Sequence, residues 1–342
     1  MSAIAQLPMP NTYVKLMTQA TDDPERLLAG TGISVSEALD GDGPITVQQQ
    51  LTCSRNSAAM QGRPDWHLAW VHRVAERFHG PISAAWTSAP TLGDGLDVFI
   101  RYMPTRIPYL RWSTHRDGER WHVELRPLMD LGDIGPLLVE FPLLTLGIYM
   151  RTLQGGRLDG VSFEFPHAAL ADLADYRRVI PADFAFDGRR AAMVMPAAAR
   201  ALPNPGYDEV LWTTALRRCE AAAQEHAGTA IINQVVEALH ESLEHPWSSR
   251  TPPTLADMAT HLHVSVSTLN RRLREASTSY QALVDDVRRQ RARELLANPR
   301  QRVTDIAIEL GFLDPSSFVR SFRRWYGATP GRYRRELAAG RR

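Results

Sequence analysis

Arginines alternate with aromatic residues in one segment near the end of the chain, LGFLDPSSFVRSFRRWYG over 310–327. Phe318 and Phe322 stand four residues apart, so on a helix both would pack toward the same side. Asp314 is a favourable N-cap, and Pro315 would take the first helical position, where its missing N–H has no cost. The outward face would carry Ser316, Ser317 and Arg320, followed by Arg323 and Arg324. Serine and arginine hydrogen-bond base edges and phosphates, so the pattern predicts a helix that contacts DNA.

The residues before this helix predict a partner helix and a turn. In TDIAIELGFLDPSSFVRSF over 304–322, Thr304 is the expected N-cap, and Ile306 and Leu310 are expected in the core. Ala307 is small enough for a second helix to cross closely. Gly311 supplies a turn in which φ is often positive. The segment therefore reads as a helix-turn-helix.

An earlier segment, TLADMATHLHVSVSTLNRRL over 254–273, shows the same order of features. Thr254 would cap the first helix, with Asp257 completing a reciprocal cap. A turn is expected at His263 and Val264, and histidine tolerates positive φ better than most residues. Ser265 would then cap the second helix. The expected inward residues are Leu255, Met258, Ala259, Leu262, Leu269 and Leu273. A solvated amphipathic helix is the alternative for either segment alone, but two capped units in series favour DNA binding.

A long helix over 280–297 is expected between the two units, with Leu283, Val287 and Leu295 as its buried stripe. Such a helix would fix the separation of the two outward faces. Successive major-groove faces are roughly 34 Å apart. A rigid spacer would allow one chain to reach both.

Residues 254–335 resemble the double helix-turn-helix domain of the AraC/XylS family of bacterial transcription regulators. The similarity is strongest in IAIELGFLDPSSFVRSFRRWYGATPGRYRR, including its closing GATPGRYR. The first unit departs from the family at His263, where a glycine is usual. Pro315 stands where relatives often have a polar residue, so one base contact would be absent.

The resemblance implies a set of DNA contacts on the two recognition helices. The implied base contacts are Ser267, Asn270, Arg271, Ser316, Ser317 and Arg320. The implied phosphate contacts are Arg272, Arg274, Arg323 and Arg324. Arginine reads guanine, asparagine reads adenine and serine reads either base, which agrees with these roles.

The first 200 residues predict an α+β domain. Short helices are expected over 20–43 and a helix over 65–79. YLRWSTHR over 109–116 and RWHVELR over 120–126 alternate as strands around a turn. Further strands are expected over 161–165 and 192–195. GPISAAWTSAPTLGDGLDVFIRYMPT and FPHAALADLADYRRV resemble the sensor domain of regulators grouped with ornithine-utilisation and virulence regulators, a domain often labelled arabinose-binding-like whose ligands are diverse.

The expected organisation follows from these segments and two breaks. Residues 1–205 would form an α+β ligand-sensing and dimerisation domain, 206–228 a helical linker, and 229–342 the all-α DNA-binding domain with its two helix-turn-helix units. Helices are expected over 211–226 and 230–244, and a loop over 245–254. The domain boundary is expected near His226 to Thr229.

Charge is divided unevenly along the chain. The net charge is +1 over 342 residues, yet residues 250–342 carry 18 arginines and no lysine against nine carboxylates. That region therefore has an excess of +9, and the remainder carries −8. A basic module joined to an acidic one suits nucleic-acid binding by one part only.

Composition also limits the chemistry. Cys53 and Cys219 form neither a disulfide framework nor a metal spacing, and neither has the neighbourhood of a methyl-accepting thiolate. We expect a reducing compartment. No secretion signal is expected at the N-terminus, and the apolar stretch over 134–150 is expected to be a buried helix rather than a membrane span.

No catalytic or metal-binding arrangement is expected from the remaining polar residues. His67, His72, His79, His115 and His122 show no metal-binding spacing, and most of them are expected to be surface or capping residues. Glu124 and Glu164 form no acid–base pair. Trp112, Trp121, Phe141 and Tyr149 could line a ligand pocket, although core packing is the simpler role. An enzyme, a cofactor and a metal are therefore not expected.

The sequence favours a cytoplasmic, ligand-responsive activator that binds promoter DNA. The expected partners are double-stranded DNA, a small-molecule effector, RNA polymerase and a second copy of the chain, with no membrane. Two alternatives remain. In one, the N-terminal half is a protein-interaction module without a small ligand. In the other, it is an enzyme fused to a DNA-binding domain. The sequence does not indicate which residues bind the ligand.

Overall fold

The computed structural model separates into two compact units. The N-terminal unit comprises Pro8–Pro127 and Ile134–Ala227, and the C-terminal unit comprises Met1–Leu7, Leu128–Asp133 and Gly228–Arg342. The chain thus crosses from the N-terminal unit to the C-terminal unit and back around residues 128–133. The structure describes residues 2–41, 43–63, 65–75, 79–156, 159–225, 227–244, 252–276 and 278–339.

A five-stranded sheet organises the N-terminal unit, in the order β3-β4-β7-β5-β6. Its strands are β3 (Leu110–Asp117), β4 (Arg120–Pro127), β5 (Ser162–Glu164), β6 (Asp183–Ala185) and β7 (Ala191–Pro196). All pairings are antiparallel except that of β5 with β6. The hairpin and two further strands predicted from sequence are confirmed. The sequence missed β6, because three residues are too few to show an alternating pattern.

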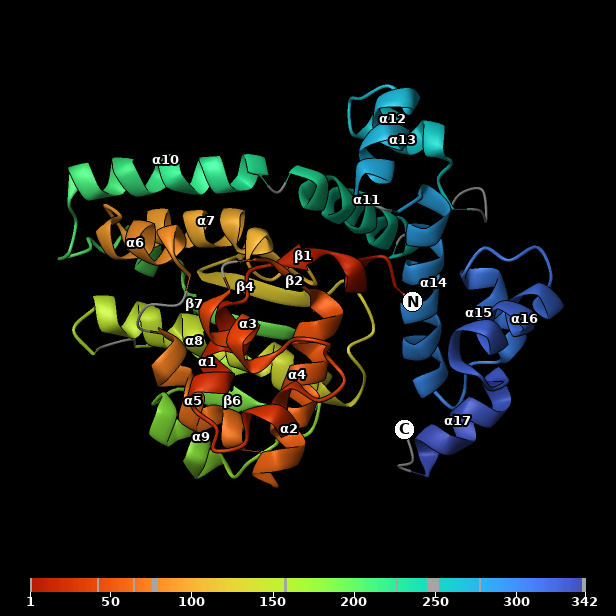
Figure 1. Ribbon diagram of the computed structural model, residues 1–342, viewed down its shortest axis with the longest axis horizontal. Helices are drawn as coiled ribbons and strands as arrows, with labels where there is room; N and C mark the ends of the chain where they lie inside the picture. Colours follow the sequence, from red (N-terminus) through yellow and green to blue (C-terminus); the bar gives the residue numbers. More distant parts are fainter. Residues whose placement is uncertain are drawn as a thin grey trace. The chain divides into compact units, whose positions relative to one another are not determined.

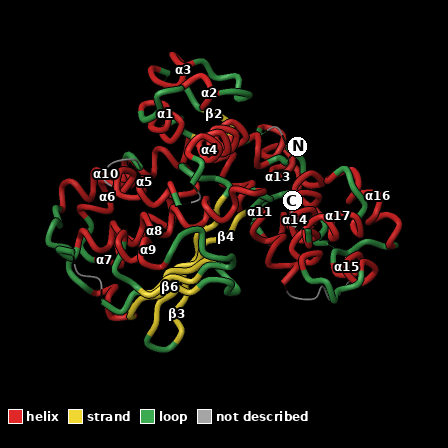
Figure 2. Tube along the Cα trace, turned by 90° about the horizontal axis from the view of Figure 1, so that it is seen from below, coloured by secondary structure: helices red, strands yellow, loops and turns green. Residues whose placement is uncertain are grey.

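Helices cover this sheet, and α8 (Gly135–Leu153) packs against β4 and β7 (Figures 1 and 2). Gly147 permits the close approach, because a Cβ there would lie 2.7 Å from Phe163 Cζ. The stretch Gly132–Leu153 is long and apolar enough to cross a membrane, but 72% of its most apolar window is buried inside the protein. The prediction of a buried helix is confirmed.

The remaining elements of the N-terminal unit surround α8 and the sheet. A small antiparallel sheet joins β1 (Pro8–Met9) to β2 (Ile45–Thr46). The other helices are α1 (Thr12–Gln19), α2 (Pro24–Leu28), α3 (Val35–Asp40), α4 (Val47–Gln61), α5 (Trp66–Ala75), α6 (Pro81–Ser88), α7 (Leu92–Tyr102), α9 (Leu173–Val179) and α10 (Glu209–Glu225). Helix α10 packs mainly on α6. Its first turn leaves Val210 and Leu211 exposed, at 73% and 59%.

Among the described residues of the C-terminal unit, all regular secondary structure is helical. It contains α11 (Ala227–Glu244), α12 (Leu255–His261), α13 (Val266–Glu275), α14 (Tyr280–Ala297), α15 (Val303–Glu309), α16 (Pro315–Tyr326) and α17 (Pro330–Ala338). Helix α14 runs from the α12–α13 pair to the α15–α16 pair (Figure 1). Leu283, Val287 and Leu295 of α14 are buried, as predicted. The loop predicted over 245–254 lies mostly outside the described residues, as does His226 at the expected boundary.

An aromatic core supports the second helix pair. Phe318 and Phe322 are fully buried, together with Ile306, Leu310 and Tyr333. Phe312, Trp325 and Tyr326 pack around this core. The inward face predicted for α16 is confirmed.

Two segments from the first half of the sequence pack within the C-terminal unit. Asp286 of α14 accepts hydrogen bonds from Ser2 Oγ at 3.0 Å and from the Ala3 backbone N–H at 2.6 Å. The Asp130 carboxylate forms an ion pair with Arg293 of α14 and accepts a hydrogen bond from the Tyr326 hydroxyl at 3.3 Å. The sequence predicts one domain over residues 1–205, but residues 1–7 and 128–133 pack with the C-terminal helices. The order of residues along the chain does not show that these two segments join the other unit.

Candidate nucleic-acid interface

The first helix-turn-helix begins at a reciprocal cap. The Thr254 and Asp257 side chains each bond the other's backbone N–H, as predicted. The turn passes through His263 at φ 54°, which confirms the expected left-handed conformation. Ser265 then caps α13 by accepting from the Thr268 N–H at 3.1 Å. These three features direct one face of α13 outward.

The outward face of α13 forms an open concavity. It is lined by Ser267, Asn270, Arg271, Arg274 and Glu275. Four of the predicted DNA contacts therefore lie together. Arg271 Nη1 lies 2.8 Å from Glu275 Oε1, so an incoming base would compete with this exposed ion pair. Arg272 is also exposed but lies outside the concavity.

The second recognition helix, α16, begins with a chain of hydrogen bonds. Asp314 accepts from the Ser317 N–H at 2.8 Å and from the Ser317 hydroxyl at 2.6 Å. Arg320 Nη2 donates to the Ser317 hydroxyl at 2.9 Å. The bonds from Ser317 lower the pKa of Asp314 and hold its carboxylate ionised. The cap predicted at Asp314 and the position of Pro315 are confirmed.

The other predicted contacts on α16 point to solvent. Ser316, Arg320, Arg323 and Arg324 are exposed, whereas Ser317 is half-buried. Arg324 Nη2 lies 3.2 Å from Asp285 Oδ2 on α14, so Arg324 would have to leave this partner to reach a phosphate.

One predicted cap is wrong. Helix α15 begins at Val303 after Arg302, which makes no side-chain cap, and Thr304 lies inside the helix. The Thr304 hydroxyl instead accepts from the Arg302 guanidinium, at 3.2 Å from Nη2. The helix starts earlier than the capping pattern indicated, because Asp305 rather than Thr304 supplies the favourable group in the first turn.

Arg288 holds the second turn and was missed by sequence reasoning. Its guanidinium donates to the carbonyls of Leu310 and Gly311 at 2.9 and 2.8 Å, and lies 4.6 Å from the Phe312 ring centroid. Gly311 has φ 70°, as the turn requires. No sequence signal marked Arg288, because it is one of several arginines on a long helix.

Three histidines predicted to be surface or capping residues are buried instead. His67 is fully buried, and His79 and His122 are 3% and 7% exposed. His115, His122 and Glu124 bring their ligand atoms within 4.8 Å of one another, through the pairing of β3 with β4. Sequence spacing hides this cluster because the two histidines meet across strands. Arg190 already donates to Glu124 at 2.6 Å and lies 3.1 Å from His122 Nδ1, so a cation would have to displace it.

Comparison with known proteins supports the division into two modules. Residues 23–204 match the family described as the arabinose-binding domain of AraC transcription regulator, N-terminal, and residues 258–336 match a helix-turn-helix domain. The chain is 29% identical over 292 residues to the ornithine utilization regulator of Pseudomonas aeruginosa, covering 83% of this chain and 82% of that protein. It is 26% identical over 324 residues to the transcriptional regulator VirS of Mycobacterium tuberculosis, covering 94% of each. The crystal structure of the regulator CdpR from P. aeruginosa matches with 22% identity and a TM-score of 0.43, covering 95% of this chain and 96% of that one.

Proposed function

The chain belongs to the AraC family of transcription regulators, because the family match spans more than half of its length. From this membership we propose that the protein is a ligand-responsive activator. DNA-binding transcription regulation is the general function of its relatives. The specific proposal is a cytoplasmic homodimer that binds promoter DNA, responds to a small molecule and assists RNA polymerase. No catalytic role is proposed for the N-terminal unit.

The arrangement of the C-terminal unit carries this proposal. Two recognition helices stand on one long helix (Figure 1). Each of them has exposed serine and arginine residues. In the proposed complex, Ser267, Asn270 and Arg271 read one major-groove face, and Ser316, Ser317 and Arg320 read the next. Arg272, Arg274, Arg323 and Arg324 would bind phosphates and add affinity without sequence information.

A route for ligand control runs through residues 128–133. This segment links β4 to α8, and its Asp130 bonds Arg293 on α14 and Tyr326 at the end of α16. A ligand that shifts the start of α8 would act directly on the segment that holds these two helices. The ligand can shift the DNA-competent population only by its difference in affinity between the two states.

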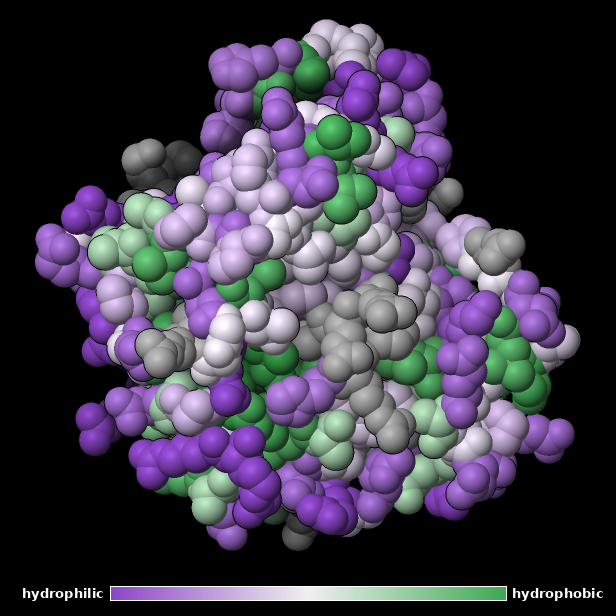
Figure 3. Space-filling model, turned by 90° about the vertical axis from the view of Figure 1, so that its left-hand side faces the viewer, coloured by the Kyte–Doolittle hydropathy of each residue, from purple (hydrophilic) through white to green (hydrophobic). Residues whose placement is uncertain are grey.

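The homodimer is proposed from the family resemblance, and the start of α10 offers an apolar surface for it. Val210 and Leu211 are exposed there, close in sequence to Tyr207, which is 48% exposed. Figure 3 shows apolar patches separated by polar residues on the side of the molecule that faces left in Figure 1. Sedimentation of the wild type and of Val210→Asp would test this surface, and an unchanged mass would exclude it.

Capture of genomic DNA tests the proposed function. Fragments bound by the purified full-length protein are sequenced with and without a metabolite extract of cells. We expect one short shared motif upstream of a transcription unit, with capture changed by extract. Random capture under both conditions would contradict a specific regulator. Capture of the motif without any effect of extract would favour the protein-interaction alternative for the N-terminal unit.

Substitution of Asp130 tests whether residues 128–133 carry the ligand response. Asp130→Asn should retain the DNA motif but alter the response to extract, because it removes the charge that binds Arg293. Asp22→Asn, an exposed change far from this segment in sequence, is the matched control. An Asp130→Asn protein that responds as the wild type does would exclude the route.

A further inference from the structure

The N-terminal unit contains an apolar cavity between α1, α4, α5 and α8. Its walls include Leu16 of α1, Gln50 of α4, Trp66 and Trp70 of α5, and Leu137 and Phe141 of α8. The pocket holds about 560 Å³ of empty space when the part open to solvent is counted. The centre of a water molecule could occupy about 60 Å³ of that space. Only the smaller value is comparable with the about 150 Å³ of an engineered apolar cavity that binds benzene, so a ring would have to reach toward the part of the pocket that is open to solvent.

Aromatic side chains dominate one wall of the cavity. The Trp66 and Trp70 rings meet edge to face, with centroids 6.2 Å apart and planes at 86°. Phe141 and two tyrosines, Tyr13 and Tyr109, also line the space. Aromatic rings favour further rings in offset or edge-to-face contact, so this wall suits a planar ligand.

Two buried polar atoms in the lining lack hydrogen-bond partners among the described residues. They are Gln50 Oε1, an acceptor, and Trp66 Nε1, a donor. Gln50 is only 4% exposed, and its amide nitrogen donates to Ser54 Oγ at 3.2 Å. A buried polar group without a partner is costly, so a ligand that pairs with either atom would gain affinity.

Among the residues that the structure describes, no charged side chain lines the cavity. A charged ligand would lose its hydration there without compensation, which disfavours an amino acid. A sugar is also disfavoured, because its several hydroxyls would outnumber the available polar atoms. Arg106 interacts with Tyr13 and donates to Thr12 Oγ1 at 2.6 Å, but it is not part of the lining.

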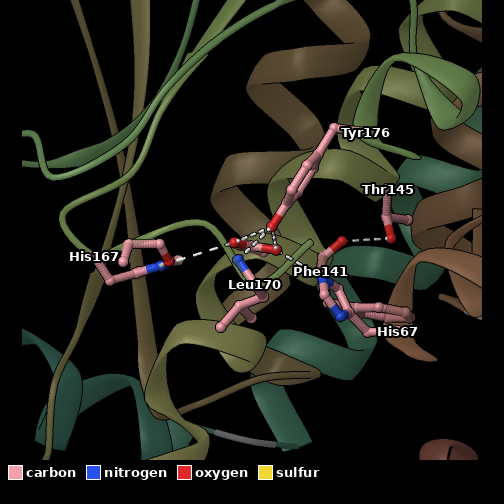
Figure 4. Close-up of polar contacts among 8 residues, drawn as sticks. His67, Phe141, Thr145, His167, Leu170 and Tyr176 are labelled. Carbon is pink, nitrogen blue, oxygen red and sulfur yellow. Dashed lines mark hydrogen bonds and ion pairs between the residues drawn. The ribbon is translucent and has the colours of Figure 1, made fainter. Parts of the chain in front are cut away.

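A buried carboxylate fixes the two helices that form the aromatic wall (Figure 4). Glu140 of α8 is fully buried, and its Oε2 lies 2.6 Å from Nε2 of His67 on α5. The Tyr176 hydroxyl donates to the same carboxylate at 2.7 and 2.8 Å, and His167 Nδ1 lies 3.8 Å away. His67 follows Trp66, and Glu140 precedes Phe141. The network thus holds the wall in place before any ligand enters.

We propose that this cavity is the binding site for a small, uncharged aromatic compound with one hydrogen-bonding group. The inference rests on the proposed ligand-responsive function and narrows its effector class. The ring would contact Trp66, Trp70 and Phe141, and its polar group would donate a hydrogen bond to Gln50 Oε1. Leu137 and Leu138, which line the cavity, lie near the start of α8, the helix that follows the segment carrying Asp130 in the chain.

Calorimetric titration of the full-length protein with phenol tests the site. Benzoate, arabinose and ornithine serve as charged or polyhydroxylated comparison compounds. We expect phenol to bind with a Kd in the millimolar range or tighter, and at least tenfold more tightly than the other three. Failure of phenol to bind, or tighter binding of any comparison compound, would overturn the proposal.

Variants locate the binding. Leu16→Trp adds bulk to the lining of the cavity and should weaken phenol binding at least tenfold, whereas Leu313→Trp adds the same bulk at a position that is 95% exposed and should have no effect. Should Leu16→Trp fail to fold by circular dichroism, Gln50→Leu provides the second test. It should weaken phenol binding but not toluene binding. Unaltered phenol binding in the variants would place the compound elsewhere and overturn the assignment.

The genomic capture experiment separates this inference from the proposed function. If extract alters DNA capture but phenol does not bind, the ligand response stands and the apolar site is wrong. If phenol binds this cavity but extract leaves capture unchanged, the site stands and the ligand response is wrong.

Discussion

The two helix-turn-helix units share one order of elements but are stabilised by different means. The first relies on a reciprocal cap at Thr254 and a serine cap at Ser265, with a histidine in its turn. The second has no side-chain cap on its first helix, a glycine in its turn and a charged cap at Asp314. Among the described residues, an aromatic core surrounds the second unit, whereas the buried residues of the first unit's two helices are aliphatic.

The same contrast extends to the outward arginines. Arg320 donates to Ser317, which is itself fixed by Asp314, so its guanidinium is positioned before DNA arrives. Arg271 instead forms an exposed ion pair with Glu275 that DNA would have to break. Preorganised groups bind with a smaller entropic cost. The second recognition helix should therefore contribute more to specific affinity than the first.

The largest difference between the two helix-turn-helix units should be the loss of stability when a core residue is removed. Phe318→Ala should destabilise the second unit by about 4 kcal/mol, and Leu269→Ala the first by about 3 kcal/mol, because the phenylalanine leaves a larger cavity. Hydrogen exchange of the α16 and α13 amides would measure each unit separately. Equal or reversed losses would show that the aromatic core does not distinguish them.

The second largest difference should be the loss of DNA affinity when a base-reading arginine is removed. Arg320→Ala should cost about 1–3 kcal/mol on the specific site, roughly 5- to 150-fold in Kd, and relax preference at one base position. Arg271→Ala should cost less, because removal of the side chain also releases the ion pair with Glu275. Fluorescence anisotropy on specific and random duplexes would measure both. Equal losses on the two duplexes would argue against base reading.

Substitutions of the two turn residues should change the stability of the protein differently. Gly311→Ala should cost about 1–2 kcal/mol, because alanine is strained at positive φ. His263→Gly should be neutral or stabilise by less than about 1 kcal/mol, since relief of strain is offset by the entropy of glycine in the unfolded chain. Thermal melting of the two variants provides the measurement. Destabilisation by His263→Gly would reveal a contact that the histidine side chain makes.

Phosphate contacts should affect salt dependence rather than specificity. Arg323→Ala should weaken binding to all sequences and reduce the slope of log K against log salt by about 0.9. Arg324→Ala should reduce it less, because Arg324 is paired with Asp285 in the free protein. An unchanged slope for Arg323→Ala would contradict a phosphate contact.

The smallest effect should be a difference in acid sensitivity. The pKa of Asp314 is lowered in the folded protein, so the cap stabilises α16 above the pKa of an unfolded aspartate, about 3.9, and is lost as pH falls through the folded value. Ser265 does not titrate, so α13 has no such dependence on its cap. Amide exchange of Ser317 and Thr268 between pH 5 and 2 would compare them. Asp314→Asn should flatten the response of Ser317, and a response that survives this change would assign it to another group.

Local signals made the C-terminal unit largely predictable from sequence. The caps at Thr254, Ser265 and Asp314 and the turn residues lie within a few positions of the helices that they define. Thr304 was misplaced because two neighbouring residues could begin the same helix. The N-terminal site was not predictable in this way, because Gln50, Trp66 and Phe141 meet only in the folded protein. His67 and Glu140 also meet only in the folded protein, because they lie 73 positions apart in sequence on two different helices.

Selection of bound duplexes from a randomised pool, sequenced for the wild type, Asn270→Ala and Arg320→Ala, would test whether each recognition helix reads its own base positions. The wild type should select two blocks of conserved bases about one helical turn apart. Asn270→Ala should relax positions in one block and Arg320→Ala positions in the other, with the larger loss for Arg320→Ala. A single conserved block, or equal relaxation of both blocks by either variant, would contradict two independent readers on one rigid helix.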